Sequence, residues 1–116
     1  MGTFTDPAHE LEPEQVQERL RRGEIELIDV REQYEWDAGR VAGSKHIEME
    51  RVAARSDEIP RDRTVVFVCR LGARSGLVTQ AFRAAGWDAY NMAGGLTLWH
   101  ERGLPLEPDG GEVAPH

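Results

Sequence analysis

A strand-like apolar run, residues 65–68, ends at Cys69, and it constrains the fold more than any other part of the chain. A short loop follows in which Gly72 permits a tight turn, and a helical pattern then extends to Gly86. Strand, loop and helix in this order form the repeating unit of α/β folds. In such sheets ligands bind beyond the carboxyl ends of the strands, which is where the sequence places Cys69.

Strand-like and helical segments alternate along the rest of the chain. Extended segments are expected at residues 25–30, from 47 onward, at 64–68 and at 87–91, and helical ones at 13–22, 32–37, 52–54, 75–85 and 96–101. In the longest helix, Ser75 is the expected N-cap and the apolar face is expected to hold Leu77, Val78, Ala81, Phe82 and Ala85. The alternation predicts an α/β fold with a small central, mostly parallel β-sheet flanked by helices on both faces.

Length and composition predict one folded domain between two loose ends. The 116 residues suffice for a single core. Residues 1–10 are polar and acidic, which predicts a flexible N-terminal arm, and residues 108–116 contain too few apolar groups to pack, which predicts a disordered tail. The folded domain is therefore expected at residues 11–107.

Charge and cysteine content narrow the setting and the partners. A net charge of −7 argues against nucleic acid as the main partner, because phosphate binding needs a positive surface. Cys69 is the only cysteine, so no internal disulfide can form, and a single thiol fits a reducing compartment. The beginning of the chain lacks a signal-peptide pattern, and no apolar run is long enough for a membrane span. We therefore expect a cytoplasmic protein without membrane attachment.

Cys69 has two interpretations. A lone cysteine is often a small buried hydrophobic residue. Here, however, loop amides and a helix N-terminus are expected beside it, and the same loop contains Arg70 and Arg74. All of these groups stabilise an anion, so the reactive thiolate is expected to be populated near neutrality. The sequence therefore favours a nucleophile in a pocket for a small anion.

Three motifs resemble those of single-domain rhodaneses, which are sulfurtransferases that carry sulfane sulfur as a cysteine persulfide. Residues 69–75, CRLGARS, resemble the active-site loop of this family. Residues 27–31 and 39–44 are similar to its aspartate-valine-arginine strand and to the turn that follows, and residues 86–99 are similar to its C-terminal signature. The motifs stand in the family's order and span about residues 12–106. The turn departs from the family at Arg40, Ala42 and Ser44, where histidine, proline and alanine are usual.

The resemblance implies a thiosulfate sulfurtransferase whose persulfide forms on Cys69. It also implies that the anionic donor is bound by the loop amides and the two arginine side chains, at Arg70, Leu71, Gly72, Ala73 and Arg74. A thiolate would attack the outer sulfur of a donor such as thiosulfate, sulfite would leave, and cyanide or an acceptor thiol, including a protein thiol, would remove the sulfur. This chemistry needs no metal and no organic cofactor.

Three alternatives stay open. The first is a non-catalytic rhodanese-like binding or sulfur-relay module. The second is a cysteine-dependent phosphatase, but those enzymes resemble Cys-x5-Arg after a histidine, whereas four residues separate Cys69 from Arg74 and Val68 precedes the cysteine. The third is a Cys–His hydrolase. His9, His100 and His116 are instead expected on the solvated surface. His46 is expected to be a structural hydrogen-bonding residue, and Asp29 with Arg31 is expected to form a polar anchor at a strand end.

Overall fold

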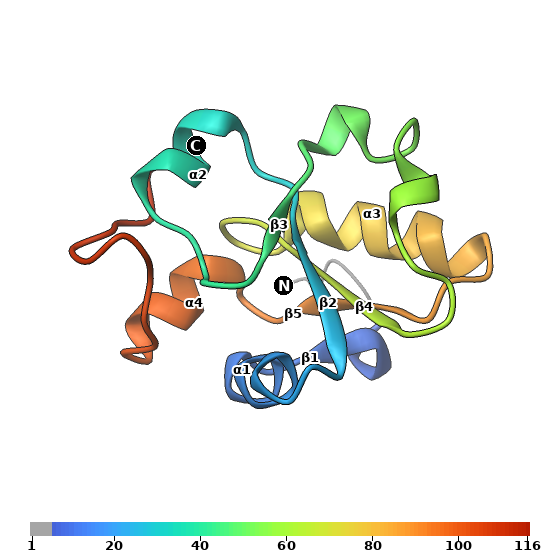
Figure 1. Cartoon of the computed structure of the whole chain (residues 1–116), viewed down its shortest axis with the longest axis horizontal. Coiled ribbons are helices and arrows are strands. Elements are labelled where there is room, and N and C mark those ends of the chain that lie inside the picture. Colours follow the sequence, from blue (N-terminus) through green and yellow to red (C-terminus); the bar gives the residue numbers. More distant parts are fainter. Residues whose placement is uncertain (1–5) are drawn as a thin grey trace.

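The centre of the molecule is a parallel sheet of five strands in the order β1-β5-β4-β2-β3 (Figure 1). We describe residues 6–116 of a computed structural model. The strands are β1 (Glu10–Leu11), β2 (Ile25–Asp29), β3 (Lys45–His46), β4 (Thr64–Val68) and β5 (Ala89–Met92). Because neighbouring strands are parallel, their carboxyl ends meet at one edge of the sheet. The expected parallel α/β sheet is confirmed.

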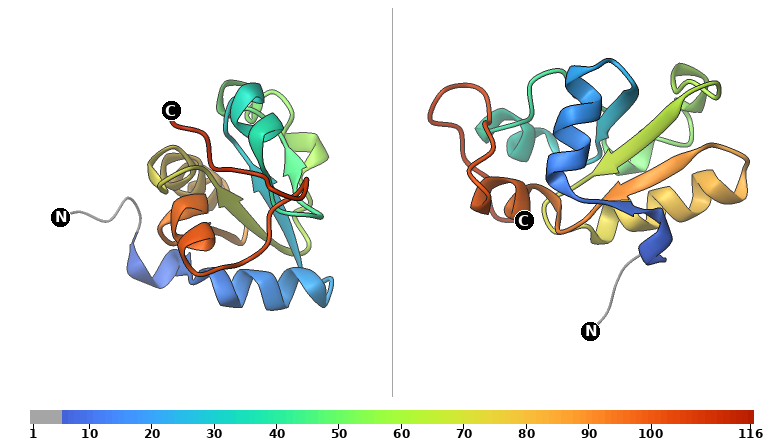
Figure 2. Two further views of the ribbon diagram at one scale, coloured as in Figure 1. Left: turned by 90° about the vertical axis from the view of Figure 1, so that its left-hand side faces the viewer. Right: turned by 90° about the horizontal axis from the view of Figure 1, so that it is seen from below.

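Helices cover both faces of this sheet (Figure 2). They are α1 (Pro13–Arg21), α2 (Gln33–Ala38), α3 (Ala73–Ala84) and α4 (Gly95–Glu101), with short 3₁₀ turns η1 (Pro7–His9), η2 (Met49–Arg51) and η3 (Ser56–Glu58). Side chains of α3 pack in one core cluster, and side chains of α1 and α4 pack in the other. Four of the five predicted helices are therefore present, whereas residues 52–54, expected as a short helix, form turns between η2 and η3.

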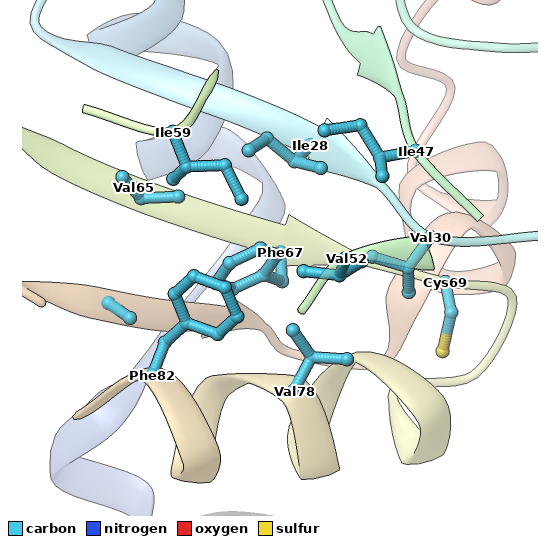
Figure 3. Close-up of a cluster of buried hydrophobic side chains, with 11 residues drawn as sticks. Ile28, Val30, Ile47, Val52, Ile59, Val65, Phe67, Cys69, Val78 and Phe82 are labelled. Atoms are coloured by element: carbon cyan, nitrogen blue, oxygen red, sulfur yellow. The ribbon is translucent and has the colours of Figure 1, made fainter. Parts of the chain in front are cut away.

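The central strand β4 supplies both cores through the two-residue period of a strand. Val65 and Phe67 belong to the cluster under α3, whereas Val66 and Val68 belong to the opposite cluster. Phe67 lies 5.0 Å from Phe82 of α3 between ring centroids (Figure 3). A strand buried on both faces reads as a continuous apolar run, which is why the sequence located β4 well.

The buried face of α3 differs from the expected one. Val78 and Phe82 are buried as predicted, but Leu77 is 59% exposed, and the helix begins at Ala73 with Gly72 as N-cap. Ser75 and Thr79 take two further buried positions, because their hydroxyls find hydrogen-bond partners inside the protein. Hydrophobicity alone therefore placed the face about one residue out of register.

The two ends of the chain have more structure than their composition predicts. Within the expected arm, residues 7–9 form η1 and Glu10 begins β1, while residues 1–5 lie outside the described residues. The C-terminal segment runs back along α2, where the Glu112 amide donates to the Ala38 carbonyl at 2.8 Å. The Tyr34 hydroxyl donates to the Pro115 carbonyl at 3.0 Å. These contacts differ from the disorder predicted for residues 108–116, and the domain boundary there stays a prediction.

None of the helices in residues 6–116 combines the length and the apolar character that crossing a membrane requires.

Candidate active site

Cys69 directly follows β4, at the carboxyl edge of the sheet. Its carbonyl oxygen accepts a hydrogen bond from the Leu96 amide at 2.9 Å, and the carbonyl of Arg70 accepts one from the Thr97 amide at 3.0 Å. These two hydrogen bonds attach the Cys69 loop to the start of α4. Gly95 lies so close that a Cβ atom there would overlap the main-chain oxygens of Cys69 and Arg70, and its φ of +62° also favours glycine.

The sulfur of Cys69 accepts hydrogen bonds from main-chain amides of the surrounding loop and also lies close to a serine hydroxyl. The amide nitrogens of Gly72 and Ser75 lie 3.1 and 3.4 Å from Sγ, and the Ser75 hydroxyl oxygen lies 3.3 Å away. The residue is 1% exposed and adjoins the core under α3, with its sulfur directed toward the start of that helix (Figure 3). Burial and hydrogen bonding therefore occur together, and the main-chain donors are those expected to stabilise a thiolate.

A small cavity of about 160 Å³ lies beside the sulfur and brings together the predicted loop residues except Gly72, whose amide instead contacts Sγ. It is lined by Cys69, Arg70, Leu71, Ala73, Arg74 and His116. A larger, mostly apolar cavity of about 680 Å³ lies beside α1 and α4, but its walls contain no cysteine, serine or histidine. Since a candidate site needs a reactive group, we place it at the smaller cavity.

Arg74 lines the cavity as predicted, and it also forms an ion pair that the sequence did not indicate. Its guanidinium donates to both carboxylate oxygens of Glu35, with nitrogen–oxygen distances of 2.8 and 3.0 Å. Glu35 is fully buried, and the side chain of Arg74 is 18% exposed. Sequence reasoning expected both Arg74 and Arg70 to bind an anion, whereas the charge of Arg74 is already compensated. Glu35 lies between the two parts of the second motif, residues 27–31 and 39–44, and nothing in that spacing indicated that it pairs with Arg74.

The environment of Glu35 keeps its carboxylate charged. Burial raises the pKa of Glu35, but the hydrogen bond from Arg74, the amide of Glu32 and the charge of Arg74 outweigh burial and leave the pKa below its usual range. The same pair raises the pKa of Arg74, first through the hydrogen bond to Glu35. The two groups therefore form a stable ion pair between α2 and α3.

Arg70 is the free cation of the cavity. Among residues 6–116 its side chain has no hydrogen-bond or ion-pair partner, and it lines both the Cys69 cavity and the adjoining surface pocket with Thr97 and His100. A guanidinium with unused donors is suited to bind a small oxyanion. Of the two predicted anion-binding arginines, the structure leaves Arg70 available.

His116 is the cavity residue that sequence reasoning missed. Its ring nitrogen Nε2 lies 3.0 Å from a carboxylate oxygen of Glu32, so the expected solvated tail instead ends at the mouth of the cavity. Glu32, Glu35 and His116 offer atoms within 4.8 Å of one another. Both oxygens of Glu35, however, accept from Arg74, whose positive charge would repel a cation. We assign no metal site to this group.

Comparisons with known proteins agree with the geometry. The family model described as Rhodanese-like domain matches residues 12–102. A protein named Sulfurtransferase from Allochromatium vinosum is 33% identical over 105 residues, which cover 88% of this chain and 98% of that protein. The Thiosulfate sulfurtransferase GlpE of Pseudomonas aeruginosa is 30% identical over 111 residues, which cover 95% of this chain and 99% of that protein.

A solved structure supports the fold alone. The rhodanese-related protein of Thermoplasma volcanium superposes with a TM-score of 0.79 at 23% identity, over 84% of this chain and 96% of that one.

Proposed function

Because the chain belongs to the family of rhodanese-like domains, we propose that it is a sulfurtransferase that moves sulfane sulfur through a persulfide on Cys69. The observation that carries the proposal is the set of main-chain donors on the sulfur. Amides of Gly72 and Ser75 point at Sγ in a cavity whose free cation is Arg70. We propose residues 11–107 as the transferase domain.

The first half-reaction would load the enzyme. The Cys69 thiolate attacks the outer sulfur of thiosulfate, a new sulfur–sulfur bond forms, and the bond within thiosulfate breaks. Sulfite leaves with the electron pair of that bond. Arg70 stabilises the charge on the sulfite oxygens, and the terminal sulfur enters the cavity lined by Leu71 and Ala73. The bound thiosulfate and the departing sulfite therefore use the same anion site.

The second half-reaction would unload it. The carbon of cyanide, or the sulfur of an acceptor thiolate, bonds to the terminal sulfur of the persulfide, and the electron pair of the broken bond returns to Sγ of Cys69. The amides of Gly72 and Ser75 stabilise the thiolate that leaves. Cyanide would yield thiocyanate and a thiol would yield a new persulfide.

Arg74 has a positioning role in this proposal. Its ion pair with Glu35 fastens the first turn of α3 to α2, so the loop amides stay directed at the sulfur. The same pair argues against phosphatase chemistry, since a Cys-dependent phosphatase needs the loop arginine as a ligand for the phosphate. Here two N–H groups of that guanidinium already donate to Glu35, which also compensates its charge.

A coupled assay tests the proposal. Purified protein is incubated with thiosulfate and cyanide, thiocyanate is measured, and mass spectrometry is used to detect one added sulfur. We expect both signals to vanish in Cys69→Ser. No thiocyanate and no added sulfur in the natural sequence would contradict sulfur transfer from thiosulfate.

A pair of arginine variants tests the anion site. Arg70→Met should raise KM for thiosulfate about tenfold, which corresponds to about 1.4 kcal/mol of lost binding. Arg51→Met is the matched control, because the Arg51 side chain is 70% exposed and does not line the cavity. An equal effect of both variants would show that general charge, and not Arg70, attracts the donor.

A further inference from the structure

A buried chain of polar side chains ends at the cysteine. The Ser75 hydroxyl oxygen lies 3.3 Å from Sγ of Cys69 and 2.6 Å from Oδ1 of Asn91. Ser75 is fully buried and Asn91 is 1% exposed, so water does not compete for these contacts. A serine hydroxyl has one proton and can donate to only one of the two neighbours. The position of that proton decides whether the serine donates a hydrogen bond to the sulfur or presents a lone pair to it.

The orientation of the Asn91 amide settles the position of the proton. Its Nδ2 lies 3.2 Å from the carbonyl oxygen of Gly72, which can only accept, so the nitrogen must face Gly72. The amide oxygen then faces Ser75 and can only accept as well. The short 2.6 Å contact therefore has the serine proton, and the longer contact to sulfur does not.

We propose that Asn91 is a positioning residue that holds the Ser75 proton away from the sulfur. The serine oxygen then presents a lone pair to Cys69, accepts the S–H of the resting thiol, and gives no hydrogen bond to the thiolate. The inference rests on the proposed function, in which Cys69 alternates between thiolate and persulfide. It assigns a role to a residue of β5 that does not touch the reacting sulfur.

This arrangement favours the loaded enzyme. In the free thiolate, Sγ is charged and faces the serine lone pair, with only the amides of Gly72 and Ser75 as donors. In the persulfide, Sγ is bonded and the charge lies on the terminal sulfur. The unfavourable contact is then removed. A thiolate with fewer donors is also the stronger nucleophile, because nucleophilicity rises with basicity.

The test is the pH midpoint of thiolate formation in sulfur-free protein, followed by ultraviolet absorbance. Asn91→Ala should release the serine proton to the thiolate and lower the midpoint by about one pH unit, the order expected for a hydrogen bond to a charged group. In that background Ser75→Ala should raise the midpoint. In the natural background Ser75→Ala should lower it or leave it unchanged, since it removes an acceptor of the S–H.

The sign of the Ser75→Ala effect therefore reports the role of Asn91. If Ser75→Ala raises the midpoint in the natural background, the serine already donates to sulfur and the proposal fails. The charged and titratable groups that face the thiol or its arginines are the same in every variant: Arg70, Arg74, Glu32, Glu35 and His116. Their contribution cancels in the comparison.

Thr79→Val is the matched control. Thr79 also buries a hydroxyl on α3, but that hydroxyl donates to the carbonyl of Ser75 at 2.8 Å and has no contact with sulfur. We expect an unchanged midpoint, and a shift equal to that of the Ser75 variants would attribute the effect to general loosening of α3 and overturn the proposal.

The infrared S–H stretch gives a second readout that does not require Asn91→Ala to fold. The single cysteine yields one band, which should have the lower frequency of a hydrogen-bond donor and shift toward that of a free thiol in Ser75→Ala. An unshifted band would overturn the proposal. Neither measurement uses a sulfur donor, so failure of the transfer assay and failure of this inference are distinguishable.

Discussion

Two arginine–carboxylate pairs stand at the carboxyl edge of the same sheet, and they differ in what they hold. Asp29 and Arg31 pair within β2 and the residues just after it, with a shortest distance of 2.7 Å and side chains 1% and 0% exposed. Glu35 and Arg74 pair across 39 positions of the sequence, with the arginine 18% exposed. One pair is local and enclosed, whereas the other is distant in sequence and reaches the cavity.

The enclosed Asp29–Arg31 pair connects the secondary-structure elements around the end of β2. Besides Asp29, Arg31 donates to the carbonyl of Gly39 at 2.7 Å, and its own carbonyl contacts Nε2 of His46 at 2.7 Å. It thereby joins β2, the end of α2 and β3. Its Nη1 has no hydrogen-bond partner within residues 6–116, so the pair already tolerates one unsatisfied buried donor. The second pair instead fixes the loop of Cys69, so stability and activity should separate between the two.

The largest expected effect is the loss of stability in Arg31→Met. This change leaves the Asp29 carboxylate buried without its cation, which costs about 3–5 kcal/mol of the free energy of unfolding. Urea denaturation measures it. The control is the double variant Asp29→Leu with Arg31→Met, which should recover much of the loss because no buried charge remains. A loss below about 1 kcal/mol in the single variant would contradict the assigned role.

Glu35→Gln should cost less stability and more activity. The amide keeps the shape of the side chain but loses the charge-assisted bonds to Arg74, which contribute about 1.5–3 kcal/mol. We expect the released guanidinium to enter the cavity and the loop to loosen, lowering kcat/KM for thiosulfate about tenfold. Urea denaturation and the thiocyanate assay give both numbers. Unchanged kcat/KM with reduced stability would show that the Glu35–Arg74 pair, like the Asp29–Arg31 pair, only stabilises the fold.

Sequence reasoning recovered what is local in the chain. The apolar run of β4, the loop after it and the Asp29–Arg31 pair all lie within a few residues, so pattern and spacing were sufficient. Their chemistry follows directly from where a parallel strand ends. The position of Cys69 was predictable for the same reason.

The rest depends on contacts between distant segments. Nothing in the spacing of Glu35 and Arg74 shows that α2 and α3 meet, so the arginine was assigned to the donor. His116 follows a stretch whose composition predicts disorder, yet it lines the cavity. The face of α3 was misplaced because the buried hydroxyls of Ser75 and Thr79 are stabilised by partners elsewhere in the fold.

Acid should remove the contribution of the Glu35–Arg74 pair to the free energy of unfolding. Arg74 holds the pKa of Glu35 below its usual range despite burial, so the folded state binds this proton more weakly than the unfolded chain does. The stabilisation is present above about pH 4.3, the unfolded value, and is lost as the pH falls through the lowered folded value.

The difference in unfolding free energy between the natural protein and Glu35→Gln should therefore be constant from about pH 7 to 5 and shrink at lower pH. The pKa values of Glu14, Glu18 and Glu58 are also lowered, but these residues are common to both proteins and cancel in the difference. A difference that persists at about pH 2 would show that the carboxylate charge is not what stabilises the pair.

The smallest effect is expected where the same geometry is exposed. Arg55 donates to both oxygens of Glu58 at 2.9 and 2.7 Å, nearly the distances of the Glu35–Arg74 pair, but the two side chains are 40% and 45% exposed. Water and salt screen such a pair, and ordering two long side chains opposes it. Arg55→Gln should leave the urea midpoint unchanged within error at any salt concentration. A loss of unfolding free energy equal to that of Glu35→Gln would show that the two-hydrogen-bond geometry, and not burial, sets the strength of all three pairs. Only their effects on activity would then distinguish the Asp29–Arg31 pair from the Glu35–Arg74 pair.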